Sequence, residues 1–366
     1  MSTRQKSSKM VAFDVLLNLL NSSFPSNKGR HYLDKKNYFI KEFKEYISFL
    51  QRFERSIRDK KKQEKALQQR FLNEKSDQIT LIGDLLLRNI DSSLIKKKVK
   101  KLFRKCIGKW AYQSQIMKRS FEKPRGYAGD YKIIEMFYDH KPVSKGIGYY
   151  FDKYILGNTL ATADIYRKDK MIELLKDFIE KNNSKKIEII NLGCGGCREL
   201  RDLFRSYSPN KKVNFIAVDQ DLEALKFSES FINDFPTEVS VNFLCKNIID
   251  LINIYRHKNP SHPLVNKQLV YSIGLVDYFA NNTLQLFIRF CLKTLVPQGQ
   301  LIFAHKNREK WKSFLAPDWF CDWRFYQRDK DEVLRLIKNE IVGCDLKIKW
   351  EKTHHMFFFI ITKKDS

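Results

Sequence analysis

The feature that most constrains the fold is a short apolar run that ends in a glycine turn. Residues 187–192 are rich in isoleucine, and Gly193-Cys194-Gly195-Gly196-Cys197 follows them directly. An amphipathic pattern typical of a helix then begins at about Arg198. Glycines let the backbone approach a ligand closely, and a helix N-terminus offers unpaired amides to polar groups. The order of strand, glycine turn and helix predicts a ligand-binding turn, with a purely structural turn as the alternative.

A carboxylate ends the next predicted strand. Residues 214–218 lead directly into Asp219, Gln220 and Asp221, about 25 residues beyond the glycine turn, and another helical pattern follows. A carboxylate in this position can accept hydrogen bonds from both hydroxyls of a ribose. Enzymes that bind a dinucleotide share this arrangement, so the two motifs together predict a nucleotide-containing ligand without choosing between cofactors.

The rest of the second half alternates short strands with helices. This alternation predicts an α/β fold with a parallel sheet covered on both faces. The two late strands would form a terminal antiparallel pair, as in a Rossmann-like class I methyltransferase with a seven-stranded sheet. The glycine turn reads G-C-G-G rather than G-x-G-x-x-G, and the fold begins in mid-chain; both features favour S-adenosylmethionine over NAD. The later strands are expected at residues 239–244, 268–273, 300–305, 345–350 and 356–362.

The first half predicts helices. Residues 1–35 are rich in Ser, Lys and Asn without a sustained period, so we expect a flexible basic arm. From Tyr38 onward apolar residues recur at steps of three and four on one helix face, which the Lys-rich stretch 59–65 continues. Further helices are expected at 81–89 and 94–117. The expected divisions are the arm, a helical region over 36–120, a cap or linker over 121–184, and a catalytic domain over 185–366.

The chain is strongly basic. It carries 68 Lys and Arg against 42 Asp and Glu, a net charge of +26. Between Ile95 and Lys123 there are 11 basic residues and one acid, Glu122. Such a segment is typical of a solvated helix face over an apolar stripe, and it is also compatible with a docking face for nucleic acid, an acidic protein or an anionic membrane surface. A compositional bias of the coding sequence would explain the excess of Lys without any partner.

The cysteines indicate a reducing compartment. There are seven, an odd number, and they are scattered; Cys194 and Cys197 are the only close pair and lie within the glycine turn. This scattered distribution does not predict a metal site, so no metal is expected. No apolar run approaches the ~18 to 20 residues that would span a bilayer. These observations together predict a cytoplasmic protein.

Four ordered segments resemble one bacterial enzyme family. They are KPRGYAGDY at 123–131, INLGCGGCREL at 190–200, VDQDLEAL at 218–225 and VYSIGLVDYF at 270–279. These segments resemble the bacterial methyltransferases identified as making 3-hydroxypalmitic acid methyl ester, an extracellular signalling factor, and the resemblance covers roughly residues 100–362. The resemblance implies a class I fold, S-adenosylmethionine as methyl donor, and methylation of a fatty-acid carboxylate.

The resemblance also implies roles for individual residues in donor binding. The glycine turn would line the methionine side, Asp219 would hold the ribose, and Glu199 would orient the turn. The complete set implied to contact the donor is Gly193, Cys194, Gly195, Gly196, Asp219, Gln220, Asn247, Ile248, Ser272 and Gly274. Of these, Gln220, Asn247 and Ile248 would surround the adenine, and Ser272 and Gly274 would close the pocket. Cys197 departs from the family, which usually has a small residue such as Ala there, and Ala304-His305-Lys306 replaces an Asn-containing segment.

The PRGYAGDY segment supplies the expected acceptor contacts. Its Gly, Pro and Tyr content marks a shaped loop, and Arg125, Tyr127, Asp130 and Tyr131 combine polar groups with large side chains of the type that caps a ligand pocket. A role in joining the helical region to the catalytic domain is the alternative for each of them.

The chemistry depends on the acceptor. A carboxylate, with a reference pKa near ~4, is ionised at neutral pH and needs no base; one cation such as Arg125 or His305 would position it. A hydroxyl or amine acceptor would need a base, for which Asp130, Asp277, Tyr278 and His305 are candidates, and Asp277 could instead cap a helix. The sequence therefore predicts an S-adenosylmethionine-dependent methyltransferase acting on a fatty or 3-hydroxy-fatty acid or related small molecule. The alternatives are methylation of RNA or protein docked by the basic helices, and a non-enzymatic domain that binds partners.

Overall fold

The computed structural model describes residues 3–23, 30–57, 62–256 and 264–365. The chain forms two compact units. The helical unit comprises Met1–Asn158 together with Lys312–Arg324, and the sheet unit comprises Thr159–Trp311 together with Phe325–Ser366. A short segment late in the chain thus belongs to the unit built by the N-terminal half.

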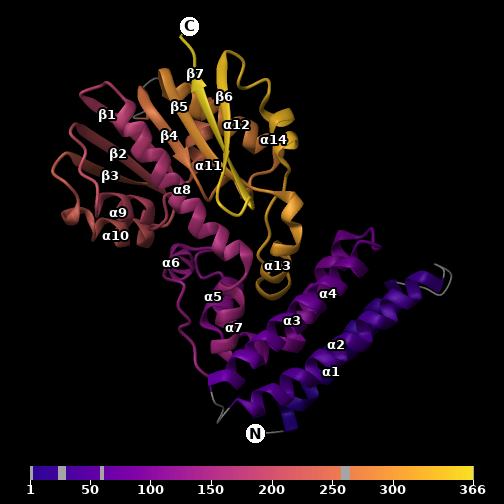
Figure 1. The fold of residues 1–366 in the computed structure, drawn as a ribbon. Coiled ribbons are helices and arrows are strands. Elements are labelled where there is room, and N and C mark those ends of the chain that lie inside the picture. The colour runs from indigo at the N-terminus through magenta and orange to yellow at the C-terminus, as the bar shows by residue number, and fades with distance from the viewer. Residues whose placement is uncertain (1–2, 24–29, 58–61, 257–263, 366) are drawn as a thin grey trace. The chain divides into compact units, whose positions relative to one another are not determined.

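The sheet unit contains one seven-stranded sheet with the order β3-β2-β1-β4-β5-β7-β6 (Figure 1). Strands β1 to β5 pair in parallel, and β7 runs antiparallel to both β5 and β6. The order and the antiparallel end are those of a Rossmann-like class I methyltransferase fold, as predicted. The strands are β1 (Lys186–Leu192), β2 (Lys212–Asp219), β3 (Val239–Cys245), β4 (Lys267–Ser272), β5 (Leu295–Lys306), β6 (Cys344–Trp350) and β7 (Met356–Lys363).

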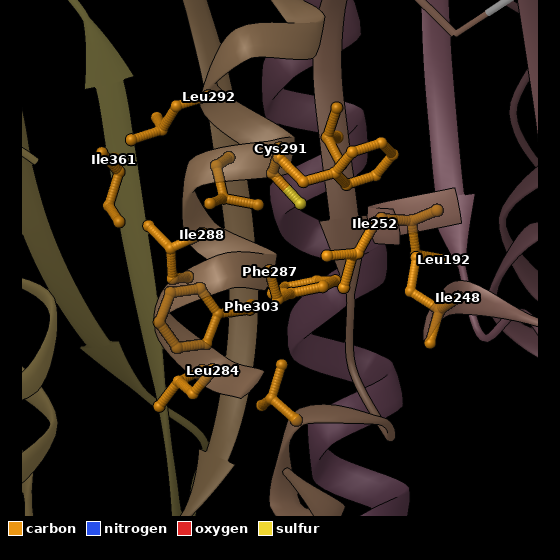
Figure 2. Close-up of a cluster of buried hydrophobic side chains, with 14 of the residues drawn as sticks. Leu192, Ile248, Ile252, Leu284, Phe287, Ile288, Cys291, Leu292, Phe303 and Ile361 are labelled. Atoms are coloured by element: carbon orange, nitrogen blue, oxygen red, sulfur yellow. The ribbon is translucent and has the colours of Figure 1, made fainter. Parts of the chain in front are cut away.

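Helices cover both faces of this sheet. In β1 the alternation of side chains sends Ile187 and Ile189 into one buried cluster and Ile190 and Leu192 into the other. Helix α12 packs in the second cluster, where Phe287 lies among apolar side chains of the strands (Figure 2). Burial on both faces explains why the strands are nearly continuous apolar runs. The α-helices of this unit are α8 (Thr159–Lys181), α9 (Arg198–Phe204), α10 (Leu222–Glu229), α11 (Ile248–Arg256), α12 (Asn281–Thr294) and α14 (Lys330–Ile337), with short 3₁₀ turns η2 (Ile232–Asp234) and η3 (Val276–Tyr278).

The helical unit is held together by aromatic side chains. Phe43 stacks on Phe39 and Phe103 with ring centroids 5.8 and 5.0 Å apart, and Trp319 meets Phe103 edge-on at 5.1 Å. The predicted apolar face that begins near Tyr38 is therefore confirmed as a core face. The helices are α1 (Thr3–Ser23), α2 (Arg30–Ser56), α3 (Lys62–Leu87), α4 (Ser93–Ala111), α5 (Gln115–Glu122), α6 (Tyr131–Asp139), α7 (Gly146–Leu156) and α13 (Leu315–Cys321); η4 (Arg308–Phe314) leads into α13.

The N-terminal segment corrects one prediction. The flexible arm expected over residues 1–35 contains α1, and α2 begins at Arg30. Leu16 and Leu20, one helical turn apart, are buried, and the Phe13 ring lies 5.8 Å from Phe43. Their burial depends on packing within the unit, which a short local apolar pattern does not reveal. Residues 24–29 lie outside the described residues.

Two expected helices also differ in their limits. Helix α2 ends at Ser56 and α3 begins at Lys62, so the Lys-rich stretch 59–65 does not extend the first helix; residues 58–61 lie outside the described part. The helix expected over 94–117 is divided into α4 and α5, because Ser114 accepts a hydrogen bond from the backbone N–H of Met117 and caps a new helix.

The expected cap or linker over 121–184 is divided between the two units. Helices α6 and α7 belong to the helical unit, whereas α8 buries Met171, Leu175 and Ile179 in a core cluster of the sheet unit. The compact sheet unit therefore begins at Thr159 rather than at residue 185.

The late segment with α13 is fixed in the helical unit by specific contacts. A Cβ added to Gly83 would lie 2.5 Å from the Trp319 ring, so α3 approaches this ring only because residue 83 is glycine. Arg104 donates to the Asp322 carboxylate at 3.1 Å, and Lys100 pairs with Asp318.

The described residues contain no helix with the length and apolar character that a membrane span requires.

Candidate functional site

The glycine turn lies at the carboxyl end of β1, beside the end of β2. Leu192 is in register with Val218, and the backbone N–H groups of Gly193 and Cys194 both donate to the Val218 carbonyl, at 2.8 and 3.1 Å. Gly193 has a φ of +69°, and a Cβ there would lie 3.2 Å from Cβ of Leu275. Both the backbone conformation and the close neighbour require glycine at this position.

Asp219 is joined to the turn by a hydrogen bond. The backbone N–H of Gly195 donates to Oδ2 of Asp219 at 2.8 Å, and that of Asp221 donates to Oδ1 at 2.9 Å. Burial raises the pKa of Asp219 above its ordinary value, although these backbone donors act in the opposite direction. A carboxylate has about four acceptor positions. The backbone N–H of Gln220 also bonds this carboxylate, and acceptor capacity beyond these backbone donors remains for a ligand hydroxyl.

Three residues expected near the adenine lie together beside the end of β3. Nδ2 of Asn247 donates to Oε1 of Gln220 at 2.8 Å, and Oδ1 of Asn247 accepts from the backbone N–H of Ile249 at 2.8 Å. Ile248 is buried at the start of α11. The arrangement supplies polar groups and one apolar side chain next to Asp219, which suits a planar heterocycle with ring nitrogens.

Ser272 and Gly274 follow the end of β4. The buried Ser272 hydroxyl donates to the Leu192 carbonyl at 2.7 Å, which ties β4 to the end of β1 immediately before the glycine turn. The expected donor contact by Ser272 is thus an indirect one, because its hydroxyl proton is directed to the strand. Gly274 lies against the guanidinium of Arg167, whose Nη2 is 3.6 Å from the position of a Cβ on that glycine.

Arg167 was missed by the sequence reasoning. It lies on α8, is 4% exposed, and forms an ion pair with Asp164 at 3.0 Å. A buried cation beside the loop after β4 is well suited to an anionic ligand group. The sequence offers little signal for it, because Arg167 is one of several charged residues in a helical pattern. Only the fold shows that α8 places it beside Gly274.

Glu199 cross-links three elements beneath the turn. Its Oε1 accepts hydrogen bonds from Nδ2 of Asn191 on β1 and from the Tyr271 hydroxyl on β4, both at 2.8 Å. The side chain is buried, and burial raises the pKa of its carboxyl. These contacts fix the first turn of α9 relative to the two central strands and so support the shape of the glycine turn.

Asp277 and His305, expected as candidate bases, are both buried, and their polar atoms already form hydrogen bonds within the protein. Oδ1 and Oδ2 of Asp277 accept from the backbone N–H and from Nζ of Lys306, at 2.8 and 2.7 Å. Burial would raise the pKa of Asp277, but the charge of Lys306 and the hydrogen bonds that Lys306 donates lower it overall. Asp277 is therefore neither a helix cap nor an available base; it is one half of a buried ion pair.

His305 has both ring nitrogens engaged. Nδ1 lies 2.8 Å from the Lys306 carbonyl, to which it donates, and Nε2 accepts from Nη1 of Arg328 at 3.0 Å. Burial lowers the pKa of His305, and the neighbouring Arg328 adds to this effect. The ring is neutral at neutral pH and has no free acceptor nitrogen. This corrects its expected roles as a base and as a cation for a carboxylate.

Tyr278 is half-buried on η3, directly after Asp277. Its ring centroid lies 5.5 Å from that of Phe325. Tyr278 stays a candidate for contact with an acceptor.

The four residues expected at the acceptor belong to the helical unit, whereas the donor residues belong to the sheet unit. Asp130 is fully buried, caps α6 by accepting from the backbone N–H of Ile133 at 3.1 Å, and pairs with Arg119 at 2.6 Å. These contacts assign Asp130 a structural role and correct its expected role at the acceptor. Arg125 and Tyr127 are half-buried and Tyr131 is buried at the start of α6.

No family model and no curated protein matches the sequence. Solved structures do match. A possible exported protein from Bordetella parapertussis shares 14% identity with a TM-score of 0.55 over 80% of this chain and 96% of that protein. The CMeT domain of the citrinin polyketide synthase gives 13% identity and a TM-score of 0.46 over 79% and 70%. The magnesium protoporphyrin IX methyltransferase of Synechocystis, solved with bound S-adenosylhomocysteine, gives 10% and 0.42 over 57% and 88%. At these identities the first similarity establishes a shared fold alone.

Proposed function

We propose that this protein is an S-adenosylmethionine-dependent methyltransferase. The observation that carries the proposal is the bond from Gly195 to Asp219, which joins a glycine turn to a buried carboxylate at the carboxyl edge of a sheet with the class I order. Ligands of open α/β sheets bind outside the carboxyl ends of the strands, where these two features lie. The turn leaves room for the methionine part of the donor, and Asp219 accepts from its ribose.

Two further groups complete the proposed donor site. Gln220, Asn247 and Ile248 receive the adenine, since they lie together next to Asp219. Arg167 faces the carboxylate of the methionine moiety, because its guanidinium lies beside Gly274, and the next residue, Leu275, lies against Gly193 of the turn. The amide, carboxylate and guanidinium groups each match one polar part of the donor.

We further propose that the acceptor is the carboxylate of a fatty or 3-hydroxy-fatty acid or a related small molecule. One oxygen of the ionised acid forms the bond to the methyl carbon while the carbon–sulfur bond breaks and its electron pair returns to sulfur. No proton is removed in this reaction. That agrees with the commitment of Asp277 and His305 to structural bonds, which leaves neither as a base.

Arg125 is the cation that we propose for the acceptor carboxylate, with Tyr127 and Tyr131 of the same helical unit as further contacts. A guanidinium can hold a carboxylate through two parallel hydrogen bonds. The aromatic rings offer apolar surface to an acyl chain. Asp130 positions this loop through its cap on α6 and its ion pair with Arg119.

The test is a methyl-transfer assay on a panel of fatty and 3-hydroxy-fatty acids of different chain length. The proposal predicts a base-labile methyl ester identified by mass spectrometry. Arg125→Ala raises the KM for the acid about tenfold or more while leaving the affinity for S-adenosylhomocysteine unchanged, as the loss of a charge-assisted hydrogen bond predicts. Lys141→Ala, an exposed cation of the same unit, is the matched control and leaves both unchanged. Donor binding without an ester from any acid contradicts the acceptor part of the proposal.

A second candidate function rests on α4. Lys97, Lys101, Lys105 and Lys109 are exposed at four-residue intervals and therefore form one stripe along the helix. Lys97, Lys101 and Lys105 have no carboxylate at ion-pair distance within the described residues, while Lys109 lies over the Trp110 ring. Such a stripe suits a polyanion, and RNA is the acceptor it favours. The test is the affinity for a single-stranded RNA, which should fall about tenfold or more between 50 and 200 mM salt. The double variant Lys101→Glu with Lys105→Glu should abolish this binding. Both results together support this candidate.

We propose that the protein works in the cytoplasm. All seven cysteines are free thiols, and five of them are buried. Free thiols in this number are typical of a reducing compartment. Localisation of a tagged chain by cell fractionation tests this directly.

A further inference from the structure

Two thiols lie within the proposed donor-binding turn. Cys194 and Cys197 are separated by two glycines, and the backbone N–H of Cys197 donates to the Cys194 carbonyl at 3.0 Å. A four-residue reverse turn closed by this bond holds its end residues within about 7 Å between Cα atoms. Disulfides span about 4.4 to 6.8 Å between Cα atoms. The turn therefore already has nearly the spacing that a bond between the two sulfurs needs.

The two thiols share one apolar environment. Cys194 is 7% exposed and Cys197 is 3% exposed, and both belong to the core cluster that includes Leu200 on α9. Burial raises the pKa of the Cys194 thiol, and the hydrogen bond with the Cys197 thiol acts in the same direction. The Cys194 thiol of the reduced protein is therefore protonated at neutral pH.

The residue between the cysteines carries the contact on which the donor site depends. The N–H of Gly195 donates to Asp219 at 2.8 Å, and its carbonyl accepts from the Ser228 hydroxyl at 3.1 Å. Cys197 has a φ of +47° directly before α9. A link between the sulfurs pulls on both ends of this segment, so it changes the position of the Gly195 amide relative to the carboxylate.

We propose that Cys194 and Cys197 form a reversible disulfide that weakens binding of the methyl donor. This inference rests on the proposed role of the turn in donor binding. The two thiols give up two protons and two electrons as the sulfur–sulfur bond forms, and a hydroperoxide takes them up: its oxygen–oxygen bond breaks to give an alcohol and water, or two waters from hydrogen peroxide. A dithiol reverses the reaction by exchange, releasing both cysteines and becoming a disulfide itself.

The experiment compares the whole protein before and after treatment with hydrogen peroxide. Trypsin cleaves after Lys186 and Arg198, which leaves both cysteines in one peptide that contains no other cysteine. We expect this peptide to lose the mass of two hydrogens, and calorimetry to show about tenfold weaker binding of S-adenosylhomocysteine, corresponding to loss of a hydrogen-bonded contact. Dithiothreitol restores both values.

Two variants make the test specific. Cys197→Ala removes the partner thiol, so the donor affinity of this variant does not change on treatment with peroxide. Cys245→Ser removes an exposed thiol outside the turn, and this variant responds like the wild type. A peptide that stays unlinked, or that links without any change in affinity, overturns the inference. Failure of the reduced wild type to bind S-adenosylhomocysteine instead overturns the proposed function, and the peptide mass reports the link in either case.

Discussion

The backbone N–H of Gly195 donates to Oδ2 of Asp219 over 2.8 Å, which joins the turn after β1 to the last residue of β2. The two residues are 24 positions apart in the chain. Parallel pairing of β1 and β2 brings their carboxyl ends together, and Gly195 has a φ of +51°, a backbone conformation that glycine adopts readily. Asp219 thereby has a defined position at the edge of the sheet, and its ionisation governs what it can accept.

Donor binding is expected to depend on pH through Asp219. Burial raises the pKa of this carboxyl, so it takes up a proton at a higher pH than an ordinary aspartate. In the proposed site the ionised form accepts from both ribose hydroxyls, and the protonated form loses acceptor capacity. The affinity for S-adenosylhomocysteine, measured by calorimetry at descending pH, therefore weakens as the pH falls through the raised pKa. Asp219→Asn binds weakly and without this pH dependence; an Asn variant with the same pH profile as the wild type contradicts the assignment.

Gly193→Ala is expected to impair both stability and donor binding. Gly193 has a φ of +69°, where an alanine costs about 1 to 2 kcal/mol, and the added Cβ lies 3.2 Å from Leu275. Gly343→Ala is a matched control, because Gly343 has a φ of +74° but no heavy atom within 4 Å of a Cβ. Both variants lower the melting temperature by a few degrees, and Gly193→Ala alone weakens binding of S-adenosylhomocysteine. Equal donor affinity in the two variants would speak against a role for this turn.

His305 is expected to make the stability of the protein depend on pH. Burial lowers its pKa in the folded state, so the unfolded chain binds a proton more readily. The free energy of unfolding is therefore fully retained above the unfolded pKa of about 6.5 and decreases as the pH falls from there toward the lowered folded pKa. His305→Gln removes this contribution and flattens the profile, as urea unfolding at several pH values would show. His355, whose pKa burial also lowers, contributes equally in both proteins, so identical profiles would rule out the assignment.

Trp319→Ala is expected to loosen the helical unit although the residue lies late in the chain. The ring is fully buried between Phe39, Phe103 and Gly83, and loss of a buried Trp costs about 3 to 5 kcal/mol. Hydrogen exchange should accelerate in α3 and α4, with the central strands β1 and β4 less affected. Val342→Ala, at an 81% exposed position, serves as the control and changes neither. Unchanged protection of α3 and α4 would show that α13 is not part of their core.

The strands were predictable because burial on both faces leaves nearly continuous apolar sequence. Each expected strand is present, with limits that differ by one or two residues except at β5, which begins at Leu295 rather than at residue 300. There Gln298 adopts a φ of +60° and the pairing with β4 shifts in register. The helix α1 and the membership of α13 in the helical unit depend on packing against distant residues, which local periodicity does not encode.

The donor side of the candidate site was predictable for a similar reason. Parallel strands place their carboxyl ends at one edge, so a glycine turn and an aspartate at two strand ends must become neighbours. The fates of Asp277 and His305 were not predictable, because they depend on Lys306 and Arg328. Lys306 lies on β5 and Arg328 follows α13, so the fold alone brings them to Asp277 and His305. Their hydrogen bonds make these two apparent bases structural groups.

The most direct test of the account is calorimetric titration with S-adenosylhomocysteine of the wild type, Asp219→Ala and Asp234→Ala, all checked for folding by circular dichroism. Asp234 is an exposed carboxylate in the same unit and serves as the control. We expect the wild type and Asp234→Ala to bind one equivalent with the same affinity. The binding free energy of Asp219→Ala should be weaker by about 1.5 kcal/mol or more, the cost of losing charged hydrogen bonds to the ribose. A wild type that does not bind, or an Asp219→Ala variant that binds as tightly as the wild type, would contradict the account.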